Sequence, residues 1–244
     1  MRWAWVLIIG MLPMVSVDAE APTGVVDPRE YDAFWLWAAV APQSVLSQAR
    51  TLYVLKGQIE PVRGEDSRVR IIEQHAAVPQ PSDADEWLVY RVHTLRWSPA
   101  IESIVLAQLS RARAAGGRVV GVQIDFDAHT LHLGEYLDFL RKFRGKLPSD
   151  FKLSITGLLD WTGRVDSEQV NQLRGIVDEV VVQTYQGRRT IPNFADYFPR
   201  VSRLSVPFKI GLVQGGIWNC PPELTRNPWF RGYVVFLLNK GSAM

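Results

Sequence analysis

The stretch VVGVQIDFD at residues 119–127 decides both the fold and the place to look for a site. Side chains along a β-strand alternate between its two faces, so Gln123, Asp125 and Asp127 share one face and the apolar residues 122, 124 and 126 share the other. We expect the apolar face to meet helices. The polar face then points into the centre of a closed sheet, with the acids near the carboxyl end of the strand.

Seven further apolar runs have strand length, namely 34–40, 51–59, 87–95, 152–159, 179–185, 208–214 and 233–238. Most are continuous rather than alternating, as expected of parallel strands that are covered on both faces. Helical periodicity appears over 99–115, 133–147 and 167–176, and more weakly over 193–201. Strands separated by helices predict an α/β fold, a (β/α)8 TIM-like barrel.

The helix ring of this barrel is expected to be lean or incomplete. Residues 43–49 leave room for only a short helix between the first two strands, a loop with prolines at 219–228 follows the seventh, and no helix follows the eighth. The polar segment 64–85 predicts an excursion or a hairpin. A doubly wound open sheet is the alternative architecture, but the chain has no G-x-G-x-x-G or Walker pattern to support it.

Residues 1–19 predict a secretory signal peptide. Arg2 precedes an apolar run that ends at Val17, and a polar stretch begins at Glu20; the apolar core is short for a membrane span. We therefore expect 20–244 to form a single barrel domain in the periplasm or outside the cell. An uncleaved anchor is the alternative, and it would be the chain's only contact with a membrane.

The overall composition limits the classes of partner. The 27 Lys and Arg balance 25 Asp and Glu, and the net charge of +2 excludes a general attraction to nucleic acid. A single cysteine, Cys220, excludes an intramolecular disulfide and a cysteine-based zinc site. No cofactor or metal is expected. A cluster of Asp125, Asp127, His129 and His132 is a weaker alternative that would indicate a metal-dependent polysaccharide deacetylase.

The catalytic candidates lie at the carboxyl ends of the strands, where barrels carry their sites. Asp125 and Asp127 are about 6–7 Å apart along a strand, and in a poorly solvated mouth their repulsion should keep one of them protonated. A neutral carboxyl beside an ionised one suits acid-assisted cleavage of a glycosidic bond. Alternatively, these acids cap a helix or pair with Arg91. Tyr185 shares a face with Gln183 and could donate a hydrogen bond to a substrate carbonyl.

Several other strand ends supply candidates for sugar binding. Arg91 and His93 share a face, with a salt bridge as the alternative role. Asp160 is followed by Trp161, a carboxylate beside an aromatic ring. Gln214 ends the seventh strand, while Trp37, Trp161 and Trp218 are candidate stacking platforms.

The stretch 119–127 resembles the D-G-x-D-x-D-x-E signature of family-18 glycoside hydrolases, the chitinase-like barrels. Gly121 matches the glycine, Asp125 the third aspartate, and Asp127 falls on the catalytic acid. Residues 183–186 (QTYQ) align with the family's M-T-Y-D. Over nearly its whole length the chain also resembles exported bacterial barrels of unknown function with a Q-x-D-F-D strand.

The last strand extends this resemblance. Gly232 and Phe236 keep the spacing of a glycine and a tryptophan that lies under the sugar in the family. Three family aspartates are replaced here, by Val120, Gln123 and Gln186, and Asp127 stands in place of a glutamate. With Phe236, the substrate-binding candidates are Gln123, Arg91, His93, Trp37, Asp160, Trp161, Gln183, Gln214, Trp218 and Phe236.

The resemblance implies substrate-assisted cleavage of an N-acetylhexosamine-containing polysaccharide. Asp125 would orient the 2-acetamido group, Tyr185 would hold its carbonyl, and Asp127 would protonate the leaving oxygen. Because the full set of acids is not kept, two alternatives stay open: a non-catalytic glycan-binding barrel and an envelope-assembly partner. No feature of the sequence indicates an oligomeric state.

Overall fold

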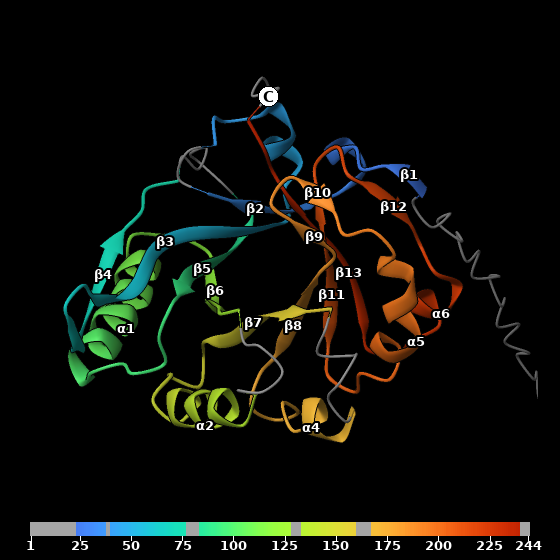
Figure 1. The fold of residues 1–244 in the computed structure, drawn as a ribbon. Coiled ribbons are helices and arrows are strands. Elements are labelled where there is room, and N and C mark those ends of the chain that lie inside the picture. The colour runs from blue at the N-terminus through green and yellow to red at the C-terminus, as the bar shows by residue number, and fades with distance from the viewer. Residues whose placement is uncertain (1–22, 38–39, 77–82, 128–132, 160–166, 240–244) are drawn as a thin grey trace, which may run out of the picture.

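The computed structural model describes residues 23–37, 40–76, 83–127, 133–159 and 167–239 (Figure 1). Eight parallel strands close into a barrel, in the spatial order β2-β13-β11-β8-β7-β6-β5-β3, and pairing of β2 with β3 completes the ring. The eight strands are β2 (Ala33–Leu36), β3 (Thr51–Val62), β5 (Asp85–Val92), β6 (Val119–Asp125), β7 (Lys152–Leu158), β8 (Glu179–Gln183), β11 (Phe208–Val213) and β13 (Phe230–Phe236). The predicted TIM-like barrel is confirmed.

The helices surround the barrel on its outside (Figure 1). They are α1 (Pro99–Ala114), α2 (Leu133–Arg144), α4 (Ser167–Asn171), α5 (Phe198–Val201) and α6 (Pro222–Thr225), with 3-10 helices η1 (Pro28–Glu30), η2 (Ser44–Gln48) and η4 (Phe194–Tyr197). Only α1 and α2 exceed five residues among the described helices, so the ring is lean, as predicted. None of the helices in the described ranges is long and apolar enough to cross a membrane.

The sequence explains where the helices begin and end. The Ser98 hydroxyl accepts from the backbone N–H of Ile101 at 3.4 Å, and a proline follows at the first helical position, so α1 begins there. The helix expected over 167–176 is shorter, since α4 ends at Asn171. Gly175 adopts a positive φ of 80° and turns the chain back towards β8.

The polar excursion is a hairpin. β4 (Glu65–Glu73) pairs antiparallel with the second half of β3 and ends the sheet outside the barrel. Two short ribbons complete the structure: β1 (Thr23–Val25) pairs with β12 (Ile217–Asn219), and β9 (Tyr185–Gln186) pairs with β10 (Arg189–Thr190). The expected strand 179–185 therefore ends two residues early, at Gln183, and Tyr185 belongs to the β9–β10 hairpin.

Polar and aromatic side chains fill the inside of the barrel below its mouth. The Trp35 indole donates to Gln123 Oε1 at 2.6 Å, and the Gln123 amide donates to Ser154 Oγ at 2.9 Å. Near the amino ends of the strands, Glu179 and Lys209 form a buried ion pair of 3.2 Å. These contacts give each of these polar groups a partner, and the side chains make the barrel a packed core rather than a pore.

Close contact between β6 and β7 depends on Gly121. A Cβ atom added there would overlap the backbone carbonyl of Lys152. The residues that follow alternate as predicted: Ile124 is fully buried on the helix side, and Gln123 is fully buried inside the barrel. The next inward residue, Asp125, reaches the mouth.

Candidate functional site

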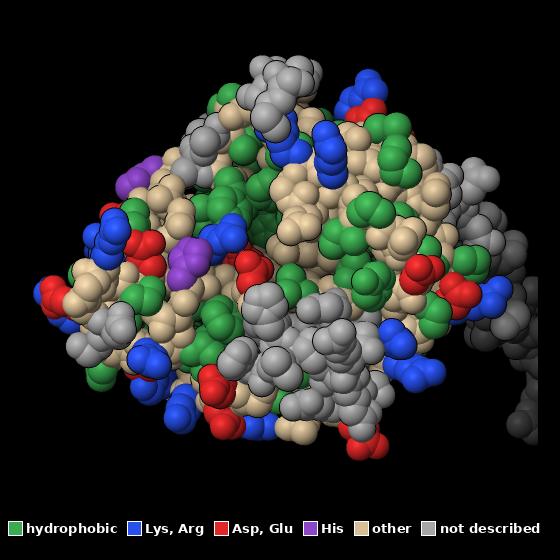
Figure 2. All heavy atoms as spheres, in the orientation of Figure 1, with side chains coloured by type: hydrophobic (Ala, Val, Ile, Leu, Met, Phe, Trp, Pro, Cys, Tyr) green, Lys and Arg blue, Asp and Glu red, His purple; other side chains and the backbone are tan. Residues whose placement is uncertain are grey.

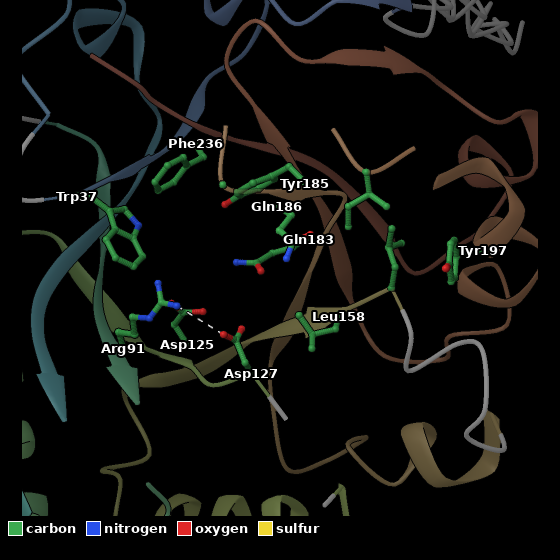
Figure 3. Close-up of a pocket in the computed structure, with 13 residues that line it drawn as sticks. Trp37, Arg91, Asp125, Asp127, Leu158, Gln183, Tyr185, Gln186, Tyr197 and Phe236 are labelled. Atoms are coloured by element: carbon green, nitrogen blue, oxygen red, sulfur yellow. Dashed lines mark ion pairs between the residues drawn. The ribbon is translucent and has the colours of Figure 1, made fainter. Parts of the chain in front are cut away.

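A cavity of about 560 Å3 opens at the carboxyl ends of the barrel strands (Figure 3). Seven of the residues predicted from the sequence line it, and they come from separate parts of the chain: Trp37, Arg91, Asp125, Asp127, Gln183, Tyr185 and Phe236. Figure 2 shows a hollow in this face, with hydrophobic side chains inside it and charged side chains at its edge. The expected convergence of both acids and the phenol on one cavity is therefore present.

Asp125 is the deeper of the two acids. It is the last residue of β6, its side chain is 7% exposed, and the Thr156 hydroxyl of β7 donates to its Oδ1 atom at 2.9 Å. Burial raises the pKa of Asp125 above the ordinary 3.8, while the Arg91 guanidinium and the Thr156 hydrogen bond lower it and Asp127 raises it further. Of the two acids, Asp125 is the one that burial favours in its neutral form.

Asp127 lies at the open edge of the cavity and is exposed. Its Oδ2 atom is 3.5 Å from the Nη2 atom of Arg91, so the ion pair that the sequence offered as an alternative role is present. The same guanidinium lies 5.2 Å from the centroid of the Trp37 ring, within cation–π range. Arg91 thus joins the acidic edge of the cavity to its aromatic wall.

The aromatic wall consists of Trp37, Phe236 and Tyr185. The Trp37 and Phe236 rings meet edge to face with centroids 5.7 Å apart, and Tyr185 stacks on Phe236 at 5.5 Å. Figure 3 shows Phe236 and Tyr185 along one edge of the cavity, Asp125 and Asp127 along the other, and Gln183 between them. Burial raises the pKa of Tyr185 well above its ordinary value, so its hydroxyl keeps its proton and can donate.

Four predicted binding residues with a described position lie outside this cavity, and three of them are polar. Gln123 is buried beneath the cavity, and its amide is committed to the barrel interior. Gln214 is half-buried and bonds Gln43 and the backbone N–H of Leu238, which ties β11 to its neighbours. His93 is exposed and lies outside the lining of the cavity.

The prediction that Trp218 is a stacking platform was wrong. The side chain is 1% exposed and packs against Phe194 at 4.9 Å and Phe198 at 5.5 Å. The short strand β12 pairs with β1 outside the barrel and turns this indole into the core beneath η4 and α5. Position near a strand end therefore did not place it at the mouth.

Some candidates lie outside the described residues. These are Asp160 and Trp161 at the end of the fifth strand, and His129 and His132 of the alternative metal cluster. Among the side chains that the structure does describe, no group of three His, Cys, Asp or Glu residues could hold a metal ion.

Sequence reasoning missed Thr156, which orients Asp125, and the cavity-lining Leu158 and Tyr197. The signal for Thr156 was available, because Ser154 and Thr156 alternate on an otherwise apolar strand in the way that marked residues 123 and 125. Tyr197 ends a 3-10 helix, η4, whose position over the mouth follows only from tertiary packing.

Comparison with known families finds one match. A model of a domain of unknown function (DUF3142) matches residues 94–190, the stretch that carries Asp125, Asp127 and Tyr185. No curated protein matches the chain.

Several solved structures are similar to the chain at low sequence identity. The xylanase-A-amylase inhibitor protein XAIP-III has a TM-score of 0.50 and 10% identity, covering 84% of this chain and 93% of its own. The Bacillus cereus spore cortex-lytic enzyme SleL has a TM-score of 0.45 and 17% identity over 74% of this chain, which spans 49% of SleL. The chitinase domain of the Clostridium difficile spore coat protein CotE has a TM-score of 0.47 and 10% identity, covering 84% of this chain and 68% of that one.

Proposed function

We propose that the protein is a glycoside hydrolase-like barrel that cleaves an N-acetylhexosamine-containing polysaccharide with the help of a protonated acid. The observation that carries this proposal is the convergence of Asp125, Asp127 and Tyr185 on one cavity at the mouth of the barrel. Its volume of about 560 Å3 falls within the range of ligand sites, which runs from roughly 300 to 1,000 Å3. The likeness to XAIP-III concerns the fold alone, so the site carries the argument.

The role of each residue in the proposed reaction follows from its depth in the cavity and from the chemistry of its side chain. Asp127 is the acid open to the cavity; in the proposed reaction it leaves its contact with Arg91, takes up a proton, and donates that proton to the leaving oxygen as the glycosidic C–O bond breaks. The 2-acetamido oxygen of the substrate attacks the anomeric carbon in the same step. Tyr185 donates a hydrogen bond to the acetamide carbonyl, and Asp125, held by Thr156, orients that group. Water then opens the cyclic intermediate, and Asp127 recovers its proton.

The aromatic wall suits a sugar ring. Trp37 and Phe236 meet edge to face, and both border the cavity. The apolar face of a sugar can pack against such rings while its hydroxyls bond polar groups like Gln183. This combination of carboxylates, an amide and aromatic rings is the chemical basis for choosing a glycan.

A non-catalytic glycan-binding barrel is the second candidate, and the Arg91–Asp127 contact favours it. A carboxylate 3.5 Å from a guanidinium is already paired with a charge. If that pair persists when glycan is bound, Asp127 stays an acceptor, and the site holds a sugar without cleaving it.

The proposal includes export from the cytoplasm. Its support is the apolar run from Trp3 to Val17, followed by a polar stretch from Glu20. Amino-terminal sequencing of the protein from the periplasmic fraction of a bacterial host tests it. The expected first residue lies at or next to Glu20, and an intact Met1 on protein confined to the cytoplasm would contradict it.

Release of reducing ends from N-acetylglucosamine polymers tests the catalytic proposal. We expect the protein to cleave, Asp127→Ala to lose roughly 10²–10⁴-fold in rate while still binding, and Asp127→Glu to retain cleavage. Asp138→Ala, on the exposed face of α2, is the matched control and should cleave normally. Equal binding by all forms with no cleavage would establish the binding candidate. Absence of both binding and cleavage would refute the carbohydrate proposal.

A further inference from the structure

A second cavity adjoins the one at the mouth. It measures about 400 Å3 and lies under the β9–β10 hairpin, with an apolar lining that includes Pro192, Phe194 and Ile217. Ile191 lines both cavities, so the two cavities are adjacent. A chain molecule that occupies the first cavity can therefore extend into the second.

Two hydrogen bonds, one to a side chain and one between backbone groups, hold in place the hairpin that borders this second cavity. Thr190 Oγ1 accepts from the Ile217 N–H at 3.0 Å, and the Ile191 N–H donates to the Thr184 carbonyl at 2.9 Å. Gly216 permits this contact, because an added Cβ atom would lie 2.5 Å from Thr190 Oγ1. The backbone of the hairpin consequently has a defined position relative to the mouth.

Two of these side chains are the arginines Arg188 and Arg189, both exposed and both part of the lining of the second cavity. Arg188 donates to the backbone carbonyl of Asn239 at 3.3 Å. Within the described part of the chain, neither arginine has a carboxylate within ion-pair distance. Asp127, by contrast, is already balanced by Arg91.

Among the described residues that line the two cavities, three are arginines and two are aspartates, and one of those aspartates is buried. Exposed guanidinium groups on a fixed hairpin beside an apolar groove attract an anion, and their planar shape matches a carboxylate.

We propose that the glycan is acidic and that Arg188 and Arg189 bind the carboxylate of a uronic acid residue that lies beyond the sugar held against Asp125 and Asp127. The apolar lining of the second cavity contacts the ring of that residue, and the arginines hold its charge. This inference rests on the proposed function and names the substrate class of the same site.

Calorimetric titration with matched oligosaccharides tests it. The probes are hyaluronan and heparosan hexasaccharides, which alternate N-acetylglucosamine with glucuronate, and the same molecules with every carboxyl reduced to an alcohol. At low ionic strength we expect the acidic forms to bind about five-fold or more tightly than the reduced forms. The double variant Arg188→Gln/Arg189→Gln should lose this preference and bind the reduced forms as before. Arg200→Gln, an exposed arginine on α5 outside both linings, should keep it.

The outcomes separate the inference from the proposed function. Equal binding of acidic and reduced forms, or a preference that survives in the double variant, overturns the acidic subsite and leaves glycan binding at the mouth intact. If the wild type neither binds nor cleaves these probes or a neutral N-acetylglucosamine hexasaccharide, the proposed function fails and the inference fails with it.

Discussion

Replacing Thr156 with valine tests whether Asp125 ionises in its buried position as the pH rises. The Thr156 hydroxyl donates to Asp125 Oδ1 at 2.9 Å, and the two side chains are 2% and 7% exposed. Valine keeps the shape of the threonine and removes the donor. A hydrogen bond to a neutral group contributes about 1 kcal/mol and one to a charged group about 1.5–3 kcal/mol, so the loss is larger when Asp125 is ionised.

The way in which folding stability changes with pH follows from the burial of Asp125. The pKa of Asp125 is raised in the folded protein, so as pH rises above 3.8 the unfolded chain ionises first and stability falls until the folded-state pKa is passed. Removing the Thr156 donor raises the folded-state pKa further and extends that fall to higher pH. We therefore expect Thr156→Val to destabilise by about 1 kcal/mol at pH 4 and by roughly 1 kcal/mol more at pH 8.

Urea unfolding of the wild type and the variant at both pH values measures this difference. Thr184→Val is the matched control, because Thr184 is equally buried and its hydroxyl donates at 2.8 Å to the carbonyl of Gly211, which does not titrate. The control should lose about the same free energy at both pH values. If Thr156→Val loses the same free energy of unfolding at both pH values, or loses less at pH 8, the ionisation of Asp125 in its buried position would be refuted.

Three further predictions concern the packing of the barrel and its mouth. Gly121→Ala should destabilise by roughly 1–3 kcal/mol or more in urea unfolding because of its overlap with β7, whereas Gly134→Ala in α2 has open space and should not destabilise; equal effects would contradict the close approach of β6 and β7. Lys209→Met should cost roughly 3–5 kcal/mol by leaving the Glu179 carboxylate buried without its positively charged partner, and adding Glu179→Gln should recover most of this; a double variant no better than the single would contradict the pairing. Trp37→Ala should weaken glycan binding by roughly 1–2 kcal/mol in calorimetry, and unchanged affinity would exclude it from the sugar platform.

The eight-strand barrel could be predicted because its strands are continuous apolar runs of the right length, and one of them, 119–127, alternates clearly. That alternation also placed Asp125 and Asp127 on the inner face. How far below the mouth of the barrel each inward side chain lies could not be predicted in the same way. Gln123 shares their face, but it lies one step below the mouth and its amide is used by the barrel interior.

Segments that follow the strands were harder to predict. Tyr185 reaches the cavity from a hairpin rather than from the end of β8, because the strand ends at Gln183 and the chain pairs with residues 189–190. Trp218 also follows a barrel strand, β11, yet β12 leads it into the core. Local sequence does not encode the direction that such a segment takes, since that direction depends on which distant segment it pairs with.

The central claim is that a glycan binds where Asp125, Asp127 and Tyr185 meet. Its most direct test is a crystal structure of the Asp127→Ala variant with a bound N-acetylglucosamine-containing oligosaccharide. We predict a sugar ring against Trp37 and Phe236, with its acetamido group within hydrogen-bond distance of Asp125 and Tyr185. An oligosaccharide bound elsewhere on the molecule, with this cavity left to solvent, would contradict the account.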